Sequence, residues 1–179
     1  MLMIRRGLLA DARGVAAVEF ALILPILIML YFGVVELTQG VMAEQRNAHT
    51  ASTVGDLVSQ SASITASGVD DIFTVGSALV YPYPTTTLGM RVSSVTESAA
   101  GVVSVDWSRA SGMTALAKQA TVSDPNLANV ISKGQSAIVA ESQYTYTSVF
   151  SYIMPKPVTF DQKYYLRPRL SSQVTCSDC

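Results

Sequence analysis

The chain offers few side chains of the kinds that carry out chemistry, and their spacing limits what each could do. Its one histidine, His49, has no second histidine and no nearby cysteine to share a metal, so it is typical of a solvated surface residue. Asp70 and Asp71 are adjacent, and adjacent helical residues point in different directions. Such a pair is typical of a helix N-terminus, where negative charge is favourable.

The sequence also lacks the short motifs that announce enzymes. It contains no glycine-rich phosphate loop, no G-x-S-x-G and no S-x-x-K. We therefore expect a protein with no catalytic residue, no metal and no cofactor.

The two cysteines form a C-x-x-C pair, Cys176 and Cys179, at the C-terminal end of the sequence. In redox proteins this motif opens a helix that lowers the thiol pKa, and no helix follows it here. We expect a small structural disulfide in the tail. Free thiols and a bond to another chain are the alternatives.

The carboxylate with the most unusual setting is Glu19, which stands near the start of a long apolar run. No charged residue occurs from 20 to 35, and counting outwards to residues 15–37 gives the roughly 20 residues that cross a bilayer as a helix. A carboxylate in the bilayer core costs at least ~2.5–3.5 kcal/mol, so Glu19 needs a partner. The alternative is that it extends to the cytoplasmic interface.

The flanks of this segment predict its orientation. Three arginines, Arg5, Arg6 and Arg13, precede it, and positive charge close to a span stays cytoplasmic. We therefore expect residues 38–179 to form a periplasmic or extracellular domain on a bacterial inner-membrane anchor. Net charge is −1 and the domain has no basic patch, which argues against nucleic acid as a partner.

The order of residues around the run does not suit a secretory signal, in which a small-residue cut site follows the apolar core. Here the small residues precede it, at Gly14 and Ala16-Ala17. The segment R-G-V-A-A-V-E-F resembles the prepilin peptidase site of type IV pilins. This resemblance implies a leader over residues 1–14, cleavage between Gly14 and Val15, and Glu19 as the fifth mature residue. The new Val15 amine of one subunit would then pair with Glu19 of its neighbour in a filament.

Beyond the membrane-spanning segment, mostly apolar residues recur every three to four positions, which predicts that the helix continues to about Ser59. Its expected inner stripe is Val41, Gln45, Ala48, Ala51, Val54, Leu57 or Val58, and Ile64. The remaining predicted elements are a helix over 69–81, a hairpin of 90–97 with 102–107, a helix from Asp124-Pro125-Asn126 to Ser132, and strands within 136–150 and 162–175. They suit an α+β, pilin-like fold in which a long N-terminal helix, membrane-spanning in its first half, packs on a roughly four-stranded antiparallel sheet.

Several phrases resemble the TadE/TadG-like minor pseudopilins of tight-adherence (Tad) pilus systems: G-V-A-A-V-E-F-A-L-I-L-P, V-D-W-S-R-A, S-A-I-V-A-E-S-Q-Y-T-Y and Y-Y-L-R-P-R. The resemblance implies a subunit that helps initiate, cap or decorate a Tad pilus used in adherence. Its implied partners are the prepilin peptidase, other major and minor pilin subunits and the inner-membrane assembly platform. A type II secretion pseudopilin and an unassembled membrane-anchored periplasmic protein are the alternatives.

Overall fold

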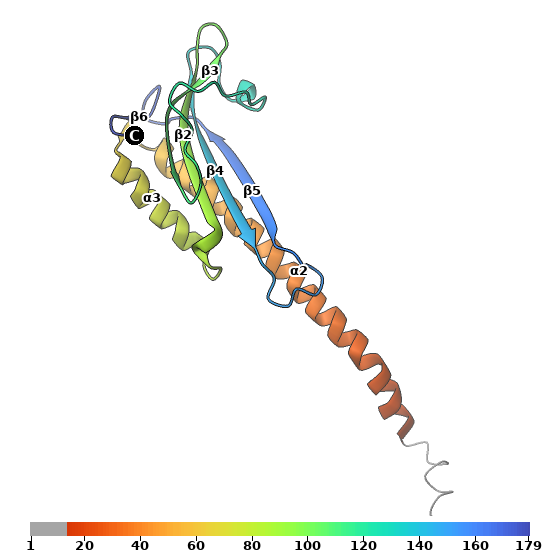
Figure 1. Cartoon of the computed structure of the whole chain (residues 1–179). Helices are drawn as coiled ribbons and strands as arrows, with labels where there is room; N and C mark the ends of the chain where they lie inside the picture. The colour runs from red at the N-terminus through yellow and green to blue at the C-terminus, as the bar shows by residue number, and fades with distance from the viewer. Residues whose placement is uncertain (1–13) are drawn as a thin grey trace, which may run out of the picture.

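A computed structural model describes residues 14–179 and is dominated by one helix, α2 (Val15–Ser59). Its 45 residues make it about 66 Å long at 1.5 Å per residue. Figure 1 shows its first half extending alone from the molecule and its second half lying against the rest of the chain. The expected leader, with Arg5, Arg6 and Arg13, lies outside the described residues except for Gly14.

The second half of α2 packs on an antiparallel sheet of four strands in the order β3-β2-β4-β5. These strands are β2 (Leu88–Glu97), β3 (Val103–Ser111), β4 (Ser136–Tyr146) and β5 (Val158–Leu166). A second helix, α3 (Ala66–Leu79), lies beside α2 (Figure 1). The smaller elements are the parallel pair β1 (Ser63–Ile64) and β6 (Thr175–Cys176), and the 3-10 turns η2 (Thr85–Thr87) and η3 (Leu127–Asn129). The expected α+β fold, a long helix on a four-stranded antiparallel sheet, is confirmed.

Both faces of the sheet are covered. One apolar cluster fills the space between the sheet and the two helices, with Val54, Phe73 and Trp107 among its buried members. A second cluster lies on the opposite face, where Leu127 and Ile131 cover the strands. Residues 115–123 belong to this covering layer, because Leu116, Ala120 and Val122 pack against the second cluster.

The predicted end of the long helix, near Ser59, is confirmed, but its predicted inner stripe was wrong in its first members. Val41 and Gln45 are exposed, whereas Ala43 and Asn47 are fully buried. The helix approaches the sheet so closely that its inner face requires small or hydrogen-bonded residues. Apolar spacing therefore selected the wrong face at the start of this half, whereas Ala51, Val54 and Val58 of the predicted stripe are buried.

The second predicted helix exists but begins earlier, at Ala66, because the Thr65 hydroxyl accepts a hydrogen bond from the Gly68 N–H at 3.1 Å. Asp70 and Asp71 consequently lie beyond the first turn, which corrects the N-terminal role expected of them. The Asp70 carboxylate instead pairs with Arg109 of β3, with 2.5 Å between oxygen and nitrogen.

The helix predicted from Asp124 to Ser132 is reduced to the turn η3. The Asp124 carboxylate accepts hydrogen bonds from the Asn126 N–H and the Tyr165 hydroxyl, and the chain then turns to bury Leu127. The last predicted strand also shifts, since β5 starts directly after Pro157 and ends before Pro168. Proline cannot donate to a strand ladder, which suits both boundaries.

Candidate functional site on the anchor helix

The N-terminal end of α2 carries the residues that the sequence singled out. Gly14 caps the helix, and no atom of its surroundings lies within 4 Å of the position that a Cβ would occupy there. Val15 is the first helical residue, and Glu19 lies one turn further on, so both belong to the same face. Glu19 is exposed and forms no hydrogen bond or ion pair with any residue of the described range 14–179.

The first half of α2, residues 15–32, has the properties of a membrane anchor. Every side chain of this stretch is exposed, although nearly all are apolar. The helix is long and apolar enough to cross a bilayer and stays continuous through Pro25. A single apolar N-terminal helix is consistent with membrane anchoring.

A second carboxylate, Glu36, stands where this exposed half ends, and it is 1% exposed. Its two oxygens accept hydrogen bonds from the backbone N–H groups of Ile153, at 2.7 Å, and Met154, at 3.3 Å. Both donors belong to the β4–β5 loop, residues 147–157. Glu36 therefore fixes this loop on the helix.

Glycines on either side of Glu36 make room for the same loop. A Cβ at Gly33 would lie 2.6 Å from the Ile153 side chain, and one at Gly40 would lie 3.0 Å from the Met154 side chain. Residues three and four apart share a helix face, so the three residues form one docking strip for the loop. Aromatic packing extends the contact, with the rings of Phe32 and Phe150 4.9 Å apart.

Sequence reasoning missed this docking strip, because in the sequence Glu36 stands out only as the charge that closes the apolar run. The signal that could have found it is the spacing G-x-x-E-x-x-x-G over residues 33–40, which puts a carboxylate between two small residues on one helix face.

Further along α2, a buried polar cluster holds the helix on the sheet. The Asn47 amide donates to the backbone oxygens of Ser142, at 3.2 Å, and Phe160, at 2.9 Å. The oxygen of the same amide accepts from the Ser142 hydroxyl at 2.5 Å. At the C-terminal end of α2, the Arg169 guanidinium forms an ion pair with Asp56, and the Arg169 backbone N–H donates a hydrogen bond to the Ser59 backbone oxygen. These contacts fix the position of α2 along β4 and β5.

On the far face of the sheet, charged side chains tie β2, β4 and β5 together. Glu141 is within 2.5 Å of Arg91 and 3.0 Å of Lys163. Burial opposes ionisation of Glu141, but these two cations outweigh it and lower its pKa below the usual value. Lys163 also lies 3.2 Å from Asp124, so two cations and two carboxylates pair with one another across this part of the sheet.

The tail holds the two cysteines. The structure joins Cys176 and Cys179 in a disulfide with 5.6 Å between their Cα atoms. Their sulfurs and an Asp178 oxygen lie within 4.8 Å of one another. Because both sulfurs are in the disulfide, neither is available as a thiolate ligand, and the trio is unsuited to a metal. His49 is exposed on α2, which is a different element from the tail and is distant from it in the sequence, so His49 is not a member of this group.

Residues 14–56 match the family model described as TadE-like protein. The match begins at Gly14 and includes Val15, Glu19 and Glu36, but it ends before β1 and leaves the sheet outside. No curated protein and no solved structure matches the chain.

Proposed function

Since residues 14–56 match the TadE-like family model, we propose that the chain is a minor pilin-like subunit of a Tad pilus. It is a structural subunit without catalytic activity that helps initiate, cap or decorate the filament. Its partners are other pilin subunits and the inner-membrane assembly platform. The TadE-like match favours this reading over a type II secretion pseudopilin.

Processing is the first step of the proposal. The prepilin peptidase would cut between Gly14 and Val15, leaving α2 as a permanent anchor with its N-terminus on the cytoplasmic side. Open space around Gly14 at the start of α2 supports access to this peptide bond.

The observation that carries the proposal is the setting of Glu19. An exposed carboxylate within an apolar segment has no partner among residues 14–179, although a charge inside the bilayer strongly favours being paired. Cleavage would create a positive amine on Val15 of every subunit. In a filament, Glu19 of one subunit would pair with the Val15 amine of its neighbour and cancel both charges.

Sequencing the N-terminus of the membrane-bound protein from its native host tests the processing step. The mature chain should begin Val-Ala-Ala-Val-Glu, and Gly14→Leu should leave full-length precursor. An intact N-terminus in the wild type, or one beyond Leu37, would overturn the pilin-like assignment.

Replacing Glu19 tests assembly separately from processing. We expect Glu19→Ala to be inserted and largely cut, yet to fail to support pili in a deletion strain, because the neighbour's amine loses its partner. Glu19→Gln should fail nearly as completely, and Glu19→Asp should recover part of the function. Glu44→Ala, which removes an exposed carboxylate from the outer half of the same helix, is the matched control and should support normal piliation. Normal piliation of the strain carrying Glu19→Ala would remove the support for charge pairing.

A further inference from the structure

The β4–β5 loop, residues 147–157, exposes apolar side chains that a water-facing loop would not need. No charged residue occurs between Glu141 and Lys156. Val149 is 86% exposed, Phe150 51% and Tyr152 57%. Loops at a water-facing surface are ordinarily polar, so this cluster marks an interaction surface.

The loop lies at the level where the membrane-spanning half of α2 ends. Phe150 packs on Phe32, and Ile153 meets the helix at Gly33. From Val15 to Phe32 the helix rises about 26 Å, close to the roughly 30 Å of a bilayer hydrocarbon core. The loop is therefore beside the outer boundary of that core, where aromatic side chains favour the interface.

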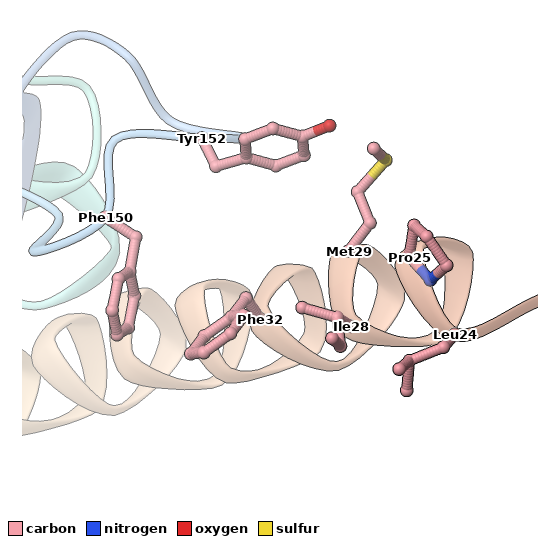
Figure 2. Close-up of a pocket in the computed structure, with 7 residues that line it drawn as sticks. All are labelled: Leu24, Pro25, Ile28, Met29, Phe32, Phe150 and Tyr152. Carbon is pink, nitrogen blue, oxygen red and sulfur yellow. The ribbon is translucent and has the colours of Figure 1, made fainter. Parts of the chain in front are cut away.

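Between the loop and the helix is a cavity of about 530 Å³. Its walls are α2 residues within 24–32 and the rings of Phe150 and Tyr152, and Figure 2 shows these rings reaching over the helix from the loop. The helix wall is entirely apolar and belongs to the anchor's exposed surface. Hydrocarbon is the chemistry that suits such a wall.

We propose that the β4–β5 loop is a lipid-binding element, which rests on the proposed membrane anchoring. Val149, Phe150 and Tyr152 insert into the outer leaflet beside α2, and an acyl chain occupies the cavity. The loop thereby sets the depth to which α2 is inserted in the bilayer before the subunit is extracted into a filament.

Three features favour lipid over a second copy of the chain. The cavity wall is continuous with helix surface that already faces lipid in the anchored protein. Lys156, at the end of the uncharged stretch, is exposed and carries the positive charge that anionic headgroups attract. Glu36 also satisfies two of the loop's N–H groups, which lowers the cost of bringing its backbone into a water-poor region.

Depth-dependent fluorescence quenching on the full chain tests the proposal. Single cysteines at positions 149, 150 and 152 would carry an environment-sensitive fluorophore, with the native disulfide kept. The protein would be reconstituted in vesicles of phosphatidylethanolamine and phosphatidylglycerol containing lipids with a nitroxide near the headgroup or near the chain end. Leu22→Cys and Leu170→Cys are matched references, since both leucines are 71% exposed. Leu22 lies on the exposed half of α2, whereas Leu170 lies in the loop between β5 and β6.

We expect blue-shifted emission and quenching by the shallow nitroxide at the three loop positions. Leu22→Cys should be quenched by the deep nitroxide, and Leu170→Cys by neither. Loop labels that behave like the label at 170, while the label at 22 is quenched, would overturn lipid binding and leave the anchor standing. Unquenched loop labels whose blue shift grows with the number of chains per vesicle would also overturn it and assign the surface to a second copy. An unquenched label at 22 would remove the anchor itself.

Discussion

Across the first half of α2, residues 15–32, every side chain is exposed, whereas the second half, residues 33–59, buries a residue every three or four positions. The buried set is Gly33, Glu36, Gly40, Ala43, Asn47, Thr50, Ala51, Val54, Gly55, Val58 and Ser59. The exposed half is the more apolar, which inverts the usual pattern of a helix in water. This inversion is consistent with a membrane anchor, since a bilayer favours apolar side chains on a helix surface.

The two carboxylates at the ends of the exposed half show what this difference means. Glu36 is buried and accepts two backbone N–H groups of its own chain. Glu19 is exposed and has no such partner among residues 14–179. A carboxylate satisfied within the chain stabilises the subunit, whereas one left free is available for another subunit. Substitutions in the second half should therefore change folding, and those in the first half should change processing or assembly.

The largest expected contrast is between two glycines. A Cβ at Gly55 would lie 2.8 Å from the Ala140 Cβ and 2.5 Å from the Leu166 side chain. Gly55→Leu should lower the free energy of unfolding by about 3 kcal/mol, because overpacking outweighs the gain in helix propensity. Gly14→Leu should change it by less than about 0.5 kcal/mol, since the surface there is open.

Urea unfolding of the full chain in detergent micelles measures both, with the single tryptophan, Trp107, as the buried reporter. Equal stability of the two variants would contradict the division of α2 into an anchoring half and a packing half.

These glycines also show how far the sequence could predict the structure. The exposed half of the helix was predicted well because a bilayer imposes one simple requirement, a long apolar run. The end of the helix near Ser59 and the hairpin were predicted for similar local reasons. The inner face was misplaced only in the first part of the packing half, because it depends there on which strands lie opposite, and small residues such as Ala43 carry little hydrophobic signal.

The docking strip on α2 could not be predicted for a related reason. Glu36 is functional only in relation to Ile153 and Met154, which are more than 110 residues away in the chain. A single sequence shows the carboxylate and its flanking glycines but not the loop that returns to them. The reduction of the helix expected after Asp124 to η3 has the same origin, since Tyr165 of a distant strand binds that carboxylate.

The second prediction concerns the buried amide. Asn47→Ala would leave the Ser142 hydroxyl and two strand oxygens without their partner, and it should cost about 2 kcal/mol of unfolding free energy. Gln45→Ala is the matched control, since that side chain is exposed and should change stability by less than about 0.5 kcal/mol. If the two variants were equally stable, the inner face of the helix would be the one predicted from apolar spacing.

The third prediction compares how the loss of Glu36 and the loss of Glu19 affect the β4–β5 loop. Glu36→Ala removes the acceptor of the Ile153 and Met154 N–H groups, so the β4–β5 loop should open more often. Cleavage of the loop by chymotrypsin, after Phe150 or Tyr152, should become about tenfold faster, the change that corresponds to about 1.4 kcal/mol in an opening equilibrium. In the Glu19→Ala variant this loop should be cleaved at the wild-type rate, because no contact within the described residues depends on the Glu19 carboxylate. Equal protection of both variants would show that Glu36 does not fix the loop.

The smallest expected effect lies beyond the end of α2, at the tail disulfide. The bond closes a very short loop, so the chain-entropy argument limits its contribution to less than about 2 kcal/mol. Other contacts hold the tail independently of it. The Trp107 indole donates to the Val174 oxygen at 2.7 Å, and the Ala66 N–H donates to the Asp178 carboxylate at 2.9 Å.

Replacing Cys176 and Cys179 together with Ser should therefore leave the tryptophan emission unchanged and lower the urea midpoint only slightly. Reductant added to the wild type should produce the same small change, which serves as the control because no side chain is altered. A red-shifted tryptophan in either case would mean that the disulfide, and not the hydrogen bonds, keeps the tail over Trp107. Complete alkylation of the wild type without reductant would show that the bond is absent, and the packing of the tail would then depend on its hydrogen bonds and on the β1–β6 pairing.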